Sequence, residues 1–133
     1  MLFRLPAIVL FVLTVAGCAS TEPQSSAVPA DISGRWTGQC TCPARGFVMD
    51  LEQSGTDVQG TVVVLGLTRE YDWNESPKTI RKGRVSGNRF TFEASGDRGD
   101  IWTAELTVSP DATKMAGYGN YRGSMSFKMT KHK

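Results

Sequence analysis

Short runs in which apolar and polar side chains alternate follow one another from residue 32 onwards. A two-residue period places successive side chains on opposite faces of a strand, and helix-like spacings are scarce in the same region. Segments rich in Gly, Ser, Asn and Asp separate the runs, as is typical of tight turns. The pattern predicts about eight strands, over residues 34–42, 47–53, 58–67, 78–85, 89–94, 100–109, 114–118 and 124–131.

The regular spacing of these strands predicts an all-β, antiparallel, up-and-down barrel. About eight strands enclose either packed side chains or one small ligand. The bulky side chains expected to point inward are Trp36, Met49, Leu51, Phe90, Phe92, Met125 and Phe127. A core filled by these side chains would indicate a scaffold, whereas an open cavity would favour ligand binding.

The first residues have the pattern of a signal peptide, since Arg4 precedes a short apolar run from Leu5 to Val15. The run ends in Val15-Ala16-Gly17-Cys18, which resembles the lipobox of bacterial lipoproteins. The resemblance implies a signal peptide over residues 1–17, cleavage before Cys18, and acyl chains such as palmitate on Cys18. Each buried methylene contributes about 0.8 kcal/mol, so two or three chains anchor durably. An ordinary secretory signal or an uncleaved anchor is the alternative.

Residues 18–31 are expected to form the lipidated cysteine and a flexible tether, because they carry almost no large apolar side chains. In the lipoproteins that this segment resembles, an Asp just after the lipidated cysteine is associated with retention at the inner membrane. Here Ala19 and Ser20 follow Cys18, so the resemblance implies the outer membrane. The β-barrel domain is then expected over residues 32–133.

The start of that domain, Ile-Ser-Gly-Arg-Trp-Thr-Gly at residues 32–38, resembles the Gly-x-Trp opening of lipocalins and avidins, the calycin barrels. Short bacterial metalloprotease inhibitors begin similarly. The resemblance implies that Trp36 closes one end of the barrel and that a basic side chain, Arg122 or Lys128, packs across it. Other lipocalin signatures and a biotin site are not found, which leaves the ligand open.

The 15 Lys and Arg nearly balance the 13 Asp and Glu, which argues against a nucleic-acid partner. Four basic residues crowd one predicted hairpin: Arg81, Lys82, Arg84 and Arg89. Alternation is expected to divide them between the two faces of the sheet, which would weaken any basic patch.

Cys40 and Cys42 project to the same face of the first predicted strand. In an oxidising compartment they are expected to form a strained disulfide, to remain buried thiols, or to serve metal or redox chemistry. A metal site would need further ligands, and the only histidine, His132, lies near the terminus. No metal or other cofactor is therefore expected.

No catalytic motif stands out, and the carboxylates Asp72, Glu75, Glu93, Asp97 and Asp100 are interpreted as solvated side chains. Arg98-Gly99-Asp100, the integrin-type tripeptide, is interpreted as an ordinary turn. The candidate contact residues for a ligand or partner are the aromatic side chains Trp36, Tyr71, Trp73 and Trp102. Tyr71 and Trp73 lie in an irregular segment, 68–77, that serves as a contact surface or folds back as a lid.

These observations predict a non-enzymatic envelope lipoprotein that binds a small apolar ligand or lipid in its barrel. The alternative is a protein-interaction scaffold or inhibitor in the envelope, with a solid barrel core.

Overall fold

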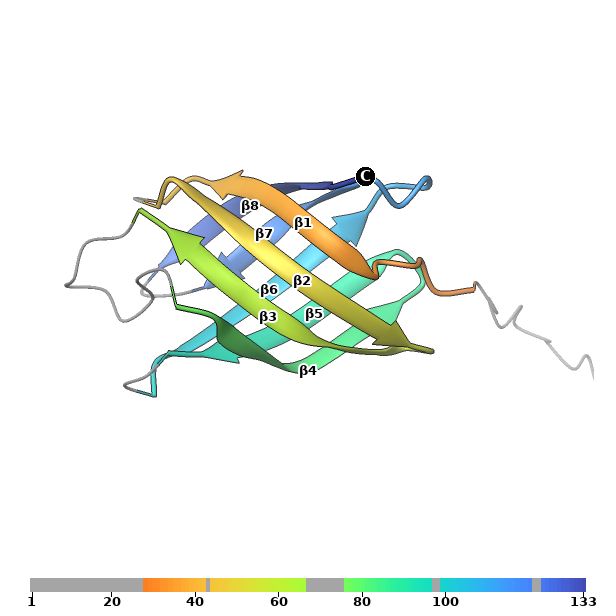
Figure 1. The fold of residues 1–133 in the computed structure, drawn as a ribbon, viewed down its shortest axis with the longest axis horizontal. Helices are drawn as coiled ribbons and strands as arrows, with labels where there is room; N and C mark the ends of the chain where they lie inside the picture. Colours follow the sequence, from red (N-terminus) through yellow and green to blue (C-terminus); the bar gives the residue numbers. More distant parts are fainter. Residues whose placement is uncertain (1–27, 43, 67–75, 97–98, 121–122) are drawn as a thin grey trace, which may run out of the picture.

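The computed structural model describes residues 28–42, 44–66, 76–96, 99–120 and 123–133. Each strand pairs antiparallel with the next, and the last pairs with the first, so that the sheet closes into a barrel (Figure 1). This confirms the predicted all-β barrel, which is consistent with a calycin-like fold. The strands are β1 (Gly34–Cys40), β2 (Gly46–Ser54), β3 (Asp57–Leu65), β4 (Lys78–Ser86), β5 (Arg89–Ser95), β6 (Ile101–Val108), β7 (Lys114–Asn120) and β8 (Ser124–Lys131).

Two ends of the barrel can be distinguished by the strand connections. The predicted turns after Ser54, Ser86 and Val108 lie at the end where the chain enters β1, which we call the tether end (right in Figure 1). Gly55 and Gly87 form two of these turns with positive φ angles of 62° and 59°, a conformation that glycine adopts without steric cost. The opposite end, called the distal end, carries the end of β3 and the start of β4.

Inward side chains fill the barrel. Six of the seven predicted core residues are buried, and Met125 is half-buried. The ring of Trp102 lies with its centroid 5.3, 5.2 and 5.2 Å from those of Phe47, Phe92 and Phe127. The space left among these rings and their neighbours amounts to about 10 Å³, which is room for one water molecule at most.

Trp36 closes the tether end, and a lysine lies over its ring. The indole Nε1 donates a hydrogen bond to the Ile32 carbonyl at 2.8 Å, and the Lys131 Nζ lies 5.7 Å from the ring centroid. The assignment of this place to Lys128 is wrong, because the β8 register turns Phe127 and Met129 inward and leaves Lys128 exposed. Arg122 lies outside the described residues.

Glycines on β7 make room for the aromatic core. A Cβ added at Gly119 would lie 2.5 Å from the Phe127 ring and 2.6 Å from the Trp102 indole nitrogen. A Cβ at Gly117 would lie 2.0 Å from the backbone oxygen of Glu105. Gly119 therefore leaves room for the aromatic rings, whereas Gly117 allows the backbone of β6 to approach closely.

Gly117→Ala should destabilise the barrel by roughly 1–3 kcal/mol, because the neighbouring backbone cannot move aside as a flexible side chain would. Thermal or urea unfolding measures the effect. Ala116→Val, on the exposed face of the same strand, should stay within about 0.5 kcal/mol of the parent. Equal stabilities of the two variants would contradict this account of the core.

Candidate functional site

The described part of the interior offers no chamber for a ligand. Sites for small molecules usually measure about 300–1,000 Å³, against the cavity of about 10 Å³ between Phe47, Phe92, Trp102 and Phe127. Trp36 and Trp102, two of the candidate contact residues, are 0% and 3% exposed and belong to the core. Tyr71 and Trp73 lie outside the described residues. Candidate sites therefore have to be sought on the outside of the barrel.

The distal end combines exposed apolar side chains with a rigid layer beneath them. Leu65, at the end of β3, is 37% exposed, and Ile101, at the start of β6, is 58% exposed. The aromatic cluster of Phe47, Trp102 and Phe127 belongs to the same end of the barrel, because Phe47 and Trp102 are the second residues of their strands. Exposed apolar residues on a rigid support are typical of protein-contact surfaces.

A buried amine lies at the same end. Lys78 begins β4, is 4% exposed, and donates a hydrogen bond from Nζ to the Ser76 hydroxyl at 2.9 Å. No prediction from the sequence concerned this residue. The strand pattern alone could have placed it inward, because Lys78 and Ile80 share a face of β4.

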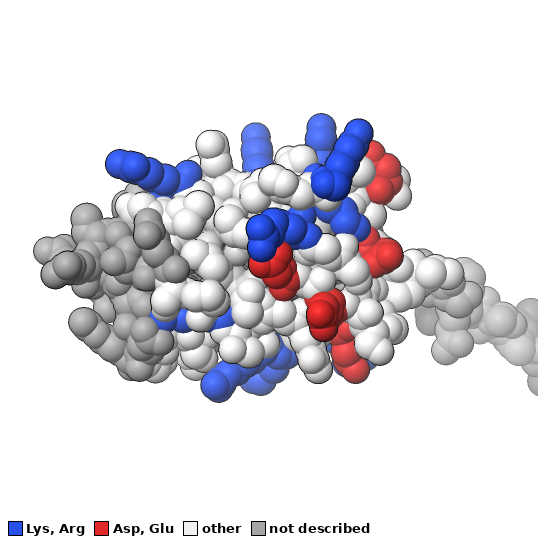
Figure 2. All heavy atoms as spheres, in the orientation of Figure 1, with Lys and Arg blue, Asp and Glu red and all other residues white. Residues whose placement is uncertain are grey.

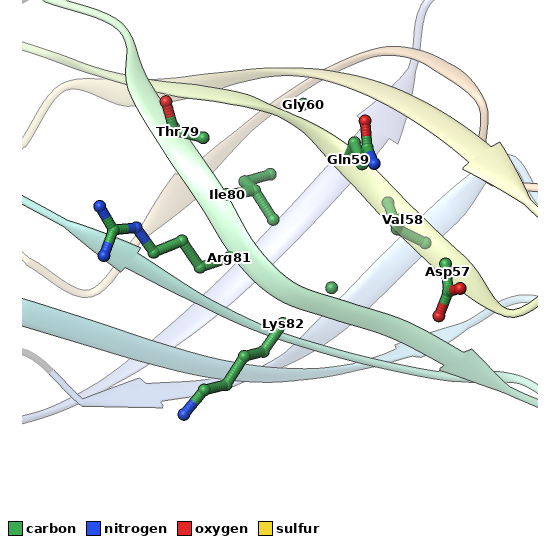
Figure 3. A pocket seen from close by; sticks show the side chains of 9 residues that line it. Asp57, Val58, Gln59, Gly60, Thr79, Ile80, Arg81 and Lys82 are labelled. Carbon is green, nitrogen blue, oxygen red and sulfur yellow. The ribbon is translucent and has the colours of Figure 1, made fainter.

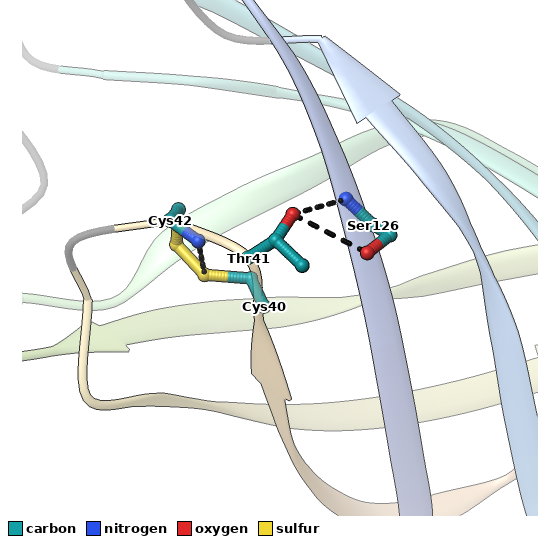
Figure 4. Close-up of a disulfide and its surroundings, with 4 residues drawn as sticks. All are labelled: Cys40, Thr41, Cys42 and Ser126. Atoms are coloured by element: carbon teal, nitrogen blue, oxygen red, sulfur yellow. Dashed lines mark hydrogen bonds between the residues drawn. A yellow bond between two sulfur atoms is a disulfide. The ribbon is translucent and has the colours of Figure 1, made fainter.

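A disulfide joins Cys40 and Cys42 at the distal end of β1, with their Cα atoms 5.1 Å apart (Figure 4). The strand ends at Cys40, two residues earlier than predicted, because the chain bends at the bridge. Between the cysteines, the Thr41 Oγ1 accepts a hydrogen bond from the Ser126 amide at 3.1 Å, and the Thr41 amide donates to the Ser126 carbonyl at 3.0 Å. These bonds attach the bridge to β8.

A hollow of about 570 Å³ opens between β3 and β4, where the register of their pairing shifts (Figure 3). The cause is a bulge in β4, in which Lys82 adopts a positive φ of 51°. The Arg81 and Lys82 side chains extend away from the hollow, so their charges do not line it. The other polar side chains that line the hollow are those of Asp57, Gln59 and Thr79.

The same bulge changes the distribution of basic residues. Arg81, Lys82, Arg84 and Arg89 are all exposed on the outer face, so their expected division between two faces is wrong. The extra residue in β4 resets the alternation between Arg81 and Arg84. Lys82 pairs with Glu93 at 3.3 Å and Arg89 with Glu105 at 2.6 Å, so acidic neighbours offset two of these four charges.

The remaining candidates do not converge on a reaction centre. Glu93 pairs with Lys82, and Asp100 lies half-buried near the start of β6. Asp72, Glu75, Asp97 and Arg98 lie outside the described residues. In the ranges that the structure describes, no three His, Cys, Asp or Glu side chains come together as a metal site would require.

Replacing both Cys40 and Cys42 by serine should leave the barrel folded and cost only about 1–2 kcal/mol, because a bridge between residues so near in sequence closes a very short loop. Urea unfolding under non-reducing conditions measures the difference, with Ser126→Ala as a second variant that removes a hydroxyl beside Thr41. Loss of cooperative unfolding in the double variant would contradict this expectation.

The described ranges contain no helix with the length and apolar character needed to cross a bilayer. Comparisons with protein-family models, with curated proteins and with solved structures found no match.

Proposed function

We propose that this chain is a lipid-anchored protein of the bacterial cell envelope, whose solid barrel is a non-enzymatic scaffold that binds an envelope protein through its distal end. The observation that carries the proposal is the filled interior. A binding module of this fold has two surfaces to offer, its inside and its outside, and the inside is occupied by its own aromatic side chains. This favours the scaffold over the barrel-bound apolar ligand.

The anchor is supported by the lipobox-like sequence at Val15–Cys18 and by where the chain enters the fold. Among the described residues, the eight strands between Gly34 and Lys131 close the barrel by themselves. The outer membrane is the proposed location, since Ala19 and Ser20 follow Cys18.

We choose the distal end because the two ends of the barrel differ in their distance from the proposed anchor and in their exposed side chains. The chain joins the barrel at the tether end (Figure 1), so a lipid on Cys18 would hold that end nearer the membrane. Leu65 and Ile101 are exposed at the other end, above the aromatic layer. An apolar rim on a rigid support suits a protein partner.

Cys18→Ser should abolish palmitate labelling and move the protein from the membrane to the soluble envelope fraction, because no acyl chain can then be attached. The double variant of Cys40 and Cys42 serves as a control and should keep both the label and the membrane location. Retention of the Cys18→Ser protein in membranes would contradict the proposed anchor.

A photo-reactive amino acid placed at Leu65 or Ile101 should give a discrete cross-linked protein in intact cells. The same group at Ser86, the last residue of β4, or at Thr113, between β6 and β7 at the tether end, should not. Ile101→Lys should lower the yield at position 65 at least several-fold, since a charge in the core of an interface opposes burial. Equal labelling at both ends, or a small molecule retained by the purified protein in native mass spectrometry, would contradict the proposed scaffold.

A further inference from the structure

The outer face of β7, β8 and β1 differs in charge from the rest of the barrel. These three neighbouring strands contain no Asp or Glu, and their exposed cations include Lys114 and Lys128. In Figure 2, basic side chains project along the upper edge, where Figure 1 places β1 and β8, and acidic side chains there gather toward the tether end. Arg35 on β1 is neutralised by Asp50, whose pKa is lowered by the hydrogen bonds that Arg35 donates.

The two lysines lie among uncharged hydrogen-bonding groups. The register places Lys128 between Ala116 on β7 and Gln39 on β1, and it places Lys114 beside Thr130. An open groove of about 430 Å³ runs over β1 and β8, lined in part by Lys128, Gln39 and Thr130. No ion pair to either lysine is found among the described residues. The groove thus offers amide and hydroxyl groups around a cation without a counter-charge.

An aromatic ring flanks the groove. Tyr118 is 73% exposed, and it lies opposite Ser126, another residue that lines the groove. Its other neighbour across the sheet, Glu105, is held by Arg89. An exposed tyrosine on a sheet face, with hydrogen-bonding side chains on the neighbouring strand, provides apolar contact area at a small entropic cost.

We propose that the β7–β8–β1 face binds an acidic polysaccharide. Tyr118 would stack against the apolar face of a sugar ring, the side chains of Gln39 and Thr130 would hydrogen-bond to sugar hydroxyls, and Lys128 and Lys114 would pair with carboxylates along the chain. This surface is separate from the distal end and does not depend on the protein partner proposed there.

The spacing of the charges selects this ligand. Lys128 lies opposite Ala116, two residues from Lys114, so their Cα atoms are separated by about 7 Å along the strands and about 5 Å across them. A dense anionic surface would be matched by contiguous cations, whereas separated cations among hydroxyl and amide groups match a polyhydroxylated chain with acidic groups at intervals.

The test uses the acyl-free chain from Ala19 to Lys133, which contains every strand, and an oligogalacturonate as the probe in titration calorimetry. Binding should weaken with added salt. Tyr118→Ala and Lys128→Gln should each weaken it about fivefold to tenfold. A neutral malto-oligosaccharide should bind more weakly than the acidic probe. Thermal unfolding verifies that these exposed substitutions leave the barrel folded.

The matched controls are Ile101→Ala, an exposed apolar residue elsewhere, and Arg84→Gln, an exposed cation on the opposite face. Both should bind the probe as the parent does. The proposal is overturned if the parent does not bind oligogalacturonate, or if Arg84→Gln loses as much affinity as Lys128→Gln. It is also overturned if phosphatidylglycerol vesicles bind more tightly than the oligosaccharide and Tyr118→Ala has no effect on them.

Discussion

Pairing of β1 with β8 is the contact on which the rest of this structure depends. Five residue pairs, from Trp36 with Lys131 to Cys40 with Phe127, close the sheet on itself. A closed sheet has no unpaired edge to protect, and its circumference fixes the volume inside. Every inward side chain must then fit a space whose size is set by the number of strands and their register. A binding site for which this space is too small has to lie on the outer surface.

The interior meets this constraint because a glycine stands beside its largest side chains. Trp102, Phe47 and Phe127 occupy the distal half, and Gly119 leaves the space that their rings take up. Among the described residues the result is a filled core with about 10 Å³ left between the rings, which corresponds to the packed alternative for a barrel of about eight strands. The same rings that stabilise the barrel also remove its inside as a binding surface, which is why both proposals concern the outside.

The outside is divided by strand register into regions of different chemistry. On β4 and β5 the bulge at Lys82 gathers four cations on one face, but Glu93 and Glu105 lie close enough to pair with two of them. On β7, β8 and β1 fewer cations lie among hydroxyl groups with no acidic residue in the strands. The number of basic residues is thus a poor guide to a basic surface, because the neighbours across the sheet decide how much charge remains.

Sequence by itself determined the strands, the turns at Gly55 and Gly87, the barrel class and four of the six buried aromatic residues, because alternation and turn chemistry are local properties of the chain. Phe47 and Trp102 were not among the residues predicted to point inward. The candidate lipid anchor also rests on a short local pattern that ends at Cys18. Only the tertiary structure decided that the interior is solid, since a volume depends on which side chains face one another across the barrel. It also placed Lys131, and not Lys128, over Trp36, and it put Arg81 and Arg84 on one face. A register between distant strands and a single extra residue in β4 set these positions, and neither is encoded in the local alternation of apolar and polar residues.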